Sequence, residues 1–255
     1  MKTINVILIF CLMFLLINNI VNTEYFSNLQ SNIQSNLQSN IIFLSSKSTF
    51  DLLKSNTKYY DTFYKNDFKV RNINNINEYL IKIENSVTDF TEKEMLLLTD
   101  AANKADDIIK NINRNYFDGN KAAKMTWKFG LTRNKDYEDG LPHTVKDTIM
   151  LCNCNDINTN MLIKVLIHEK VHIYQKMYPD DYKLYLKNKK FEIVKRRDAS
   201  DNIRANPDID MYVYKKDNKI YRATYKNNPN SITDTNENNQ YYEHPCETMA
   251  IELSK

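Results

Sequence analysis

One stretch constrains the fold of this chain more than any other, an apolar run that carries two histidines and a glutamate. Residues 168–172 read His-Glu-Lys-Val-His, an H-E-x-x-H pattern, and Leu, Ile and Val surround it at helical spacing. The spacing predicts a helix over about 160–178, which Pro179 ends. A helix that is apolar nearly all round is a buried one. Polar side chains at its centre are costly to bury unless they have a partner.

The spacing of the histidines indicates what that partner is. Residues four apart lie on one face of a helix, so His168 and His172 can present two ring nitrogens to one metal ion. Glu169 lies one step round the helix, where it can reach a metal-bound water without being a ligand. This is the arrangement of zinc hydrolases, and we predict one Zn²⁺ ion with Glu169 as the catalytic general base. The alternative is a buried helix whose histidines only bond to the main chain, which needs a separate partner for each polar group.

Length and composition favour a single domain and argue against a nucleic-acid-binding protein. The 255 residues suit one domain, and 35 basic residues against 32 acidic ones leave the chain near neutral, with both signs mixed. Because no basic stripe is present, we expect no nucleic-acid partner.

Cys11 lies in an N-terminal apolar run, which leaves Cys152, Cys154 and Cys246 in the body of the chain. Three cysteines do not form a disulfide framework, although one disulfide from Cys246 to either of the others stays open.

The N-terminal residues predict export from the cytosol. The apolar run from Val6 to Ile17 follows Lys2; it is short for a membrane span and suits the core of a signal peptide. We expect residues 1–23 to be a signal peptide or signal anchor, so that the protein is secreted or anchored in a membrane. Residues 24–42 include a four-residue repeat of polar residues with one apolar residue, which predicts a low-complexity linker. The folded domain is then expected at 43–255.

Hydrophobic periodicity in this domain predicts both helices and strands. A capping box at Thr91 and Glu94 predicts a helix over 92–113. Alternating residues predict strands at 124–131 and 144–151, shortly before the H-E-x-x-H helix. The other expected elements are helices within 50–64, 73–87 and 182–198, a hairpin of 209–214 and 220–225, and a short helix starting at Pro245. The expected fold class is α+β, mostly helical, with a small mixed sheet beside the H-E-x-x-H helix.

A catalytic zinc ion takes three protein ligands and a water, and the last helix offers candidates for the third ligand. Glu247 is the first choice, because it lies on this helix and residues 250 and 251 follow at packing spacing. Its rivals are Glu243, His244 and Cys246. An ordinary helix carboxylate in solvent is the alternative interpretation of Glu247.

With these motifs the chain resembles the gluzincins, the thermolysin-like group of zinc metallopeptidases. In that group H-E-x-x-H is followed by a helix with E-x-x-x-D or E-x-x-A-D, and the Glu of this helix is the third ligand. Residues 247–251 match E-x-x-A and depart at Ile251. The resemblance therefore implies a zincin-like fold, a peptidase activity and Glu247 as a zinc ligand. Ile251 replaces the Asp that orients a ligand histidine, a task for which Asp208, Asp210 or Glu243 are candidates.

The resemblance covers two short motifs in the last third of the chain. The chain is also similar to uncharacterised H-E-x-x-H proteins encoded by large DNA viruses and protists. The metzincin tail is absent, because Gln175 stands where its Gly would be and Tyr178 where its third His would be. By analogy with zincins, Ile149 and its neighbours are expected to pair with an extended substrate.

We therefore predict a zinc-dependent metallopeptidase that acts on a peptide or protein substrate. His143 and Tyr242, or its neighbour Tyr241, are candidates to stabilise the oxyanion, although a surface histidine and packing aromatics are the simpler interpretation. A catalytically inactive zinc-binding protein, acting as a surface or virion interaction component, is the alternative, and the departure at Ile251 favours it. A third hypothesis is a membrane-tethered interaction module in which the N-terminal half is the functional part.

Overall fold

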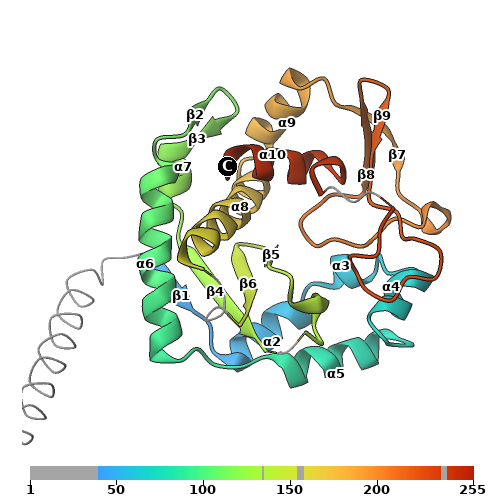
Figure 1. The fold of residues 1–255 in the computed structure, drawn as a ribbon, viewed down its shortest axis with the longest axis horizontal. Helices are drawn as coiled ribbons and strands as arrows, with labels where there is room; N and C mark the ends of the chain where they lie inside the picture. Colours follow the sequence, from blue (N-terminus) through green and yellow to red (C-terminus); the bar gives the residue numbers. More distant parts are fainter. Residues whose placement is uncertain (1–39, 134, 154–157, 237–239) are drawn as a thin grey trace, which may run out of the picture. The chain divides into compact units, whose positions relative to one another are not determined.

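Helix α8 (Thr159–Met177) carries the H-E-x-x-H motif and packs against helices α6 (Glu92–Ile109) and α10 (Pro245–Leu253). Our computed structural model describes residues 40–133, 135–153, 158–236 and 240–255, and Figure 1 shows α8 crossing the middle of this part. Leu162, Leu166 and Val171 are fully buried. The helix predicted from the apolar spacing is confirmed, with each end one residue earlier than expected.

A four-stranded mixed sheet lies beside α8. Its strands are, in spatial order, β1 (Ile41–Phe43), β4 (Trp127–Thr132), β6 (Thr148–Cys152) and β5 (His143–Val145). The first three are parallel, and β5 runs antiparallel to β6 at the edge. The expected small mixed sheet is thus present. The folded unit begins at Ile41, two residues before the expected start at 43, because β1 pairs with β4.

The single strand expected over 144–151 is wrong. Lys146 has a φ of 56°, and this left-handed residue turns the chain back so that β5 and β6 form a hairpin. Helix α6 begins with the predicted capping box, in which Thr91 and Glu94 bond to each other's main-chain N–H. It ends four residues earlier than expected, just before a turn in which the Gly119 N–H donates to the carbonyl of Ile112.

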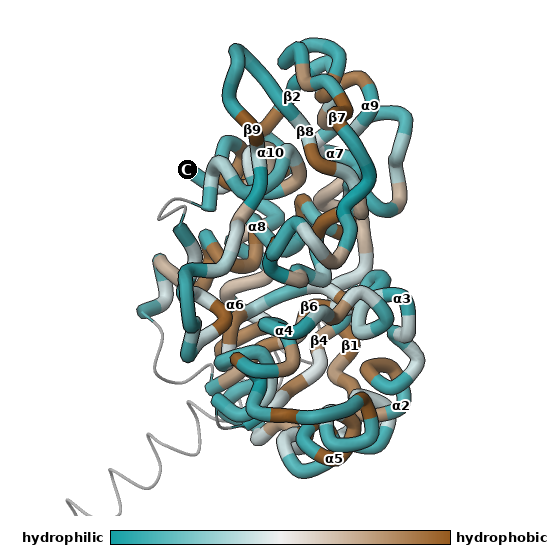
Figure 2. The backbone as a smooth tube through the Cα atoms, turned by 90° about the vertical axis from the view of Figure 1, so that its right-hand side faces the viewer, coloured by the Kyte–Doolittle hydropathy of each residue, from teal (hydrophilic) through white to brown (hydrophobic). Residues whose placement is uncertain are grey.

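Each face of the sheet packs against its own set of helices. Ile149 and Leu151 of β6 join the hydrophobic core that contains α6 and α8, whereas Met150 joins a second core. The helices expected within 50–64 and 73–87 are confirmed, although the first of them begins earlier, at Ser46. The helices of this N-terminal group are α2 (Ser46–Lys54), α3 (Thr57–Tyr60), α4 (Lys65–Val70) and α5 (Ile76–Ser86). In Figure 2 hydrophobic stretches gather around β1, β4 and α6, and outer turns are hydrophilic.

The C-terminal third adds a three-stranded antiparallel sheet of β7 (Glu192–Arg196), β8 (Tyr212–Lys216) and β9 (Lys219–Tyr221). The predicted hairpin is confirmed as β8 and β9. The helix expected over 182–198 is wrong in its second half, because helix α9 (Pro179–Asn188) ends before Lys190, which has a φ of 59°, and residues 192–196 then pair with β8. Helix α10 starts at Pro245 as predicted.

Shorter elements complete the described chain. They are β2 (Asn113–Arg114), β3 (Phe117–Asp118), α7 (Gly119–Ala123) and 3₁₀ turns at Glu138–Gly140, Ala199–Asp201 and Gln240–Tyr242. Within the described ranges, no helix combines the length and the apolar character needed to span a membrane. The expected signal segment at 1–23 lies outside the described residues, as does the expected linker up to residue 39.

Candidate metal centre

Two helices that are distant in sequence bring the three predicted ligands together. His168 and His172 lie one turn apart on α8, with 3.1 Å between their Nε2 atoms. Oε2 of Glu247, from α10, lies 3.2 Å from Nε2 of His168 and 3.7 Å from Nε2 of His172. One ligand atom from each residue lies within 4.8 Å of the other two. Since His172 and Glu247 are almost completely buried, this cluster sits at the base of the site.

The start of α10 determines where Glu247 points. His244 is the N-cap, and its Nδ1 accepts a hydrogen bond from the main-chain N–H of Cys246 at 3.1 Å. Its Nε2 lies 3.1 Å from Oδ1 of Asp210. Pro245 occupies the first turn, where the absence of an N–H costs nothing. Met249 is fully buried, so the apolar side of α10 packs in the core while Glu247 faces the two histidines.

The three rivals for the third ligand make other contacts. Glu243 forms an ion pair with Arg204, with 3.1 Å between Nε and Oε1. Both ring nitrogens of His244 are occupied by the cap and by Asp210. Cys246 Sγ lies 3.1 Å from the hydroxyl of Tyr182. Of the four candidates, only Glu247 belongs to the cluster.

Among the described residues, no disulfide joins the cysteines to this site. Cys152 and Cys246 are not joined by a disulfide, so the pairing of these two that the sequence left open is wrong. Cys11 and Cys154 lie outside the described residues.

Side-chain amides, rather than the expected carboxylates, contact the candidate ligands His172 and Glu247. Oε1 of Gln175 lies 3.0 Å from Nδ1 of His172. Asn206 donates to Oε1 of Glu247 at 2.9 Å, and Gln240 donates to Oε2 at 2.8 Å. Burial opposes the ionisation of Glu247, but the positive charge of His172 and hydrogen bonds from both histidines hold the pKa of this carboxyl well below its usual value.

The expected orienting residues are bonded elsewhere. Asp208 accepts hydrogen bonds from Thr144 and Lys176, and Asp210 accepts one from Tyr214 at 2.7 Å. Glu243 pairs with Arg204. Sequence reasoning missed Gln175, although it lies three residues after His172 on the same helix and therefore on the same face.

Glu169 lies beside the cluster with an unsatisfied oxygen. Its side chain is buried, and Oε2 has no hydrogen-bond partner within the described residues. Burial, followed by the nearby Asp208 carboxylate, raises the pKa of Glu169 well above its usual value. A carboxyl group beside the cluster with an unsatisfied oxygen is suited to accept and return a proton.

A cleft of about 510 Å³ opens above the cluster. Glu169, His168 and Glu247 line it, together with His143 and the segment 204–208. The His143 ring is fully engaged, because Nε2 lies 3.0 Å from the Tyr137 hydroxyl and Nδ1 lies 3.0 Å from the carbonyl of Leu141. His143 is thus placed in the cleft wall, where an oxyanion role stays a prediction.

The two tyrosines proposed for the same role lie elsewhere. Tyr241 donates to Oε1 of Glu252 at 2.8 Å, and Tyr242 packs against Tyr221 with 5.7 Å between ring centroids. Neither is among the residues that line the cleft. Their placement gives an oxyanion role no support.

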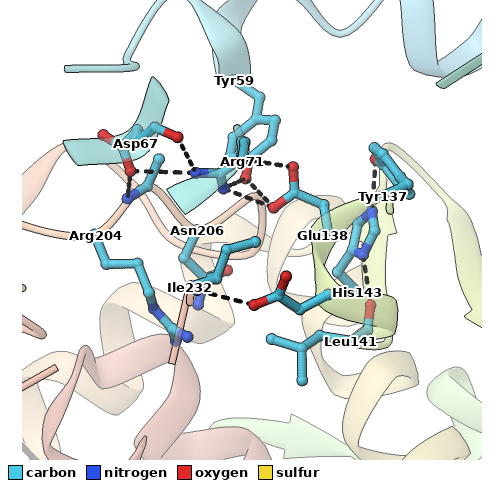
Figure 3. A network of polar contacts seen from close by, with 12 residues as sticks. Tyr59, Asp67, Arg71, Tyr137, Glu138, Leu141, His143, Arg204, Asn206 and Ile232 are labelled. Atoms are coloured by element: carbon cyan, nitrogen blue, oxygen red, sulfur yellow. Dashed lines mark hydrogen bonds and ion pairs between the residues drawn. The ribbon is translucent and has the colours of Figure 1, made fainter. Parts of the chain in front are cut away.

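A buried ion pair holds one wall of the cleft. Figure 3 shows Arg71 directed at Glu138, with Tyr59 beside both. Glu138 accepts from Arg71 Nε at 3.0 Å, from Arg71 Nη2 at 2.6 Å and from the hydroxyls of Tyr59 and Tyr79 at 2.8 and 2.6 Å. Burial opposes ionisation, but Arg71 lowers the pKa of Glu138 below its ordinary value. Sequence reasoning missed this network because its members come from four separate segments.

The sheet edge nearest the cleft is already occupied. Thr144 of β5 donates its N–H to Oδ1 of Asp208 at 2.9 Å, and its carbonyl accepts from Lys176 Nζ at 3.0 Å. Pro142, two residues earlier, has no N–H to donate. The expectation that Ile149 pairs with substrate is wrong, because β6 is an interior strand in which Ile149 lies between Phe129 and Thr144.

Comparisons of the chain with protein-family models, curated proteins and solved structures found no match.

Proposed function

We propose that this protein is a zinc-dependent metallopeptidase. His168, His172 and Glu247 would hold one Zn²⁺ ion, and Glu169 would act as general base. The observation that carries the proposal is the convergence of the three ligand atoms within 4.8 Å of one another from two separate helices. Two imidazoles and one carboxylate are a donor set of catalytic zinc sites, which keep a further position open.

The surrounding residues fit such an ion. Oε2 of Glu169 is buried and has no hydrogen-bond partner among the described residues, an arrangement that a water molecule at the site would satisfy. When bound, zinc lowers the pKa of a water molecule and polarises a carbonyl group. Glu169 would accept the proton of the attacking water and return it to the leaving amine. The mixed sheet beside α8 supports the zincin-like fold that the resemblance to gluzincins implies, and we propose that fold with the activity.

The proposed partners follow from the same site. The substrate would be a peptide or protein, and the near-neutral mixed charge still favours no nucleic-acid partner. Secretion or membrane anchoring through residues 1–23 stays a prediction.

A second candidate is a zinc-binding protein without catalytic activity, acting as a surface or virion interaction component. The occupied edge of β5 favours it, because Thr144 already uses its N–H and its carbonyl within the chain. An edge strand of this kind cannot bind a substrate strand at that residue unless Asp208 and Lys176 move.

Metal analysis and a cleavage assay on the purified full-length protein test the proposal. We expect one zinc ion per chain and cleavage of a fluorogenic peptide library that a chelator abolishes and added zinc restores. Glu169→Gln should keep the zinc and reduce cleavage by about 10²–10⁴-fold, because only the base is lost. Glu247→Gln is the matched variant that should weaken zinc binding instead.

The outcomes separate the two candidates. Zinc without cleavage would favour the interaction component. A wild-type protein without zinc after incubation with the metal would reject both.

A further inference from the structure

Gln175 connects the two helices that carry the proposed ligands. It lies on α8, and its side chain is 5% exposed. Its Oε1 faces Nδ1 of His172 at 3.0 Å, and its Nε2 donates to the carbonyl of Cys246 on α10 at 3.0 Å. Cys246 directly precedes Glu247. One amide therefore contacts one ligand and the main chain next to another.

We infer that Gln175 is a positioning residue for the metal centre, which selects the tautomer of His172 and fixes the first turn of α10. This inference rests on the metal-binding part of the proposed function. It gives a task to a residue for which neither the H-E-x-x-H nor the E-x-x-A pattern has a place.

The direction of each hydrogen bond follows from the chemistry of the groups. A main-chain carbonyl only accepts, so the Gln175 group that contacts Cys246 must be the NH₂. The oxygen of the amide must then face His172, and because this oxygen accepts, Nδ1 of His172 must carry a hydrogen. In the neutral ring Nε2 is consequently the nitrogen with a free lone pair. Nε2 is the atom that faces His168 and Glu247.

The second bond acts on Glu247 through the main chain. The Cys246 carbonyl lies in the first turn of α10, so a bond to it limits both the rotation and the translation of that turn relative to α8. A small displacement would move Oε2 of Glu247 away from the histidine nitrogens, which lie only 3.2 and 3.7 Å away. Asn206 and Gln240 donate hydrogen bonds to the two oxygens of the Glu247 carboxylate and thereby fix its orientation.

An amide performs this task without adding charge. Orienting partners of metal-bound histidines are often carboxylates, and Ile251 leaves no carboxylate at that position of the helix. With Gln175 the ring is oriented by a neutral group, and the negative charges that act on His172 come from Asp208 and Glu247.

Substitutions at two positions of α8 test the inference in the full-length protein. Gln175→Met removes both hydrogen bonds at similar length. Gln175→Glu keeps an acceptor for Nδ1–H of His172 and loses the donor to Cys246. Met177→Gln is the matched control, because Met177 is 52% exposed and lies two residues further along the same helix. Zinc affinity is measured by competition with a chromophoric chelator, and the Co²⁺ absorption spectrum reports the geometry of the ligands.

We expect Gln175→Met to lower zinc affinity by about 10–100-fold, the usual effect of losing an orienting partner, and to change the Co²⁺ spectrum. Gln175→Glu should retain more affinity than Gln175→Met, and Met177→Gln should match wild type in both measurements. These readouts do not depend on peptidase activity, and wild-type zinc binding is itself the control for the proposed function.

Two results would overturn the inference while leaving the proposed function intact. One is a Gln175→Met protein with the affinity and the Co²⁺ spectrum of wild type. The other is an equal loss of affinity in Gln175→Met and Met177→Gln, which would indicate general damage to α8. If Gln175→Met does not fold without metal, the Gln175→Glu variant tests the contact with Cys246. Wild-type zinc affinity and a wild-type Co²⁺ spectrum in Gln175→Glu would refute a role for that contact.

Discussion

The buried ion pair of Arg71 and Glu138 allows a quantitative test of how the cleft wall is held. Their side chains are 2% and 5% exposed, and two of the four hydrogen bonds to Glu138 come from Arg71. Arg71→Met leaves a buried carboxylate with only the hydroxyls of Tyr59 and Tyr79. Removing one partner of a buried pair costs about 3–5 kcal/mol, because the remaining charge is uncompensated.

The reverse substitution should cost less. In Glu138→Gln the guanidinium keeps Asp67 as a counter-charge at 3.4 Å, and the amide can still accept from the tyrosines, so we expect about 1–3 kcal/mol. The double variant should be destabilised by about 0.5–3 kcal/mol less than the sum of the two singles, because no unpaired charge remains at Glu138.

Urea unfolding of the four proteins, followed by circular dichroism, measures these differences. The slope of the free energy of unfolding against urea should stay constant if only native-state stability changes. Strict additivity of the two single substitutions would refute the reasoning, since it would mean that the two charges do not interact. An Arg71→Met protein as stable as wild type would refute it as well.

Three further outcomes are expected. The stability advantage of wild type over Glu138→Gln should decrease as pH falls below about 4.5, and urea unfolding at a series of pH values measures this. The reason is that Glu138, whose pKa is lowered in the folded state, stabilises the fold only while its carboxyl group is ionised. Burial, opposed by Asp106, lowers the pKa of Lys170 to about 8, so between pH 8 and 10.5 the unfolded chain binds more protons. Wild type should therefore gain stability relative to Lys170→Met as pH rises from 8 towards 10, and a constant difference in urea unfolding would contradict the assignment. Leu166→Ala at the fully buried centre of α8 should cost about 2–5 kcal/mol in the same assay, and a cost below 1 kcal/mol would mean that the core relaxes around the cavity.

Local patterns explain what the sequence predicted well. The apolar period of α8 and its terminal residues located that helix to within one residue, and the capping box located the start of α6. The same periodicity placed His168 and His172 on one face, and a loose E-x-x-A pattern was enough to select Glu247. These features depend on residues a few positions apart, where spacing and geometry are directly related.

Features that depend on individual backbone angles or on distant contacts were missed. Lys146 and Lys190 adopt positive φ without being glycine, so no turn signal separated β5 from β6 or α9 from β7. Asn206 reaches Glu247 from a loop and Gln240 from a 3₁₀ turn, and no periodicity relates such residues to a separate helix. Ile149 was assigned to substrate pairing because the sequence does not show which strand lies at the edge of a sheet.

The edge strand β5 has a consequence for how the molecule behaves in concentrated solution. Free main-chain groups along a sheet edge are the usual starting point for strand exchange and fibrous association between identical chains. At Thr144 these groups are bonded to Lys176 and Asp208, and Pro142 presents no donor. A neighbouring copy would have to break bonds to Asp208 and Lys176 to add a strand at Thr144, so β5 resists association at this edge of the sheet.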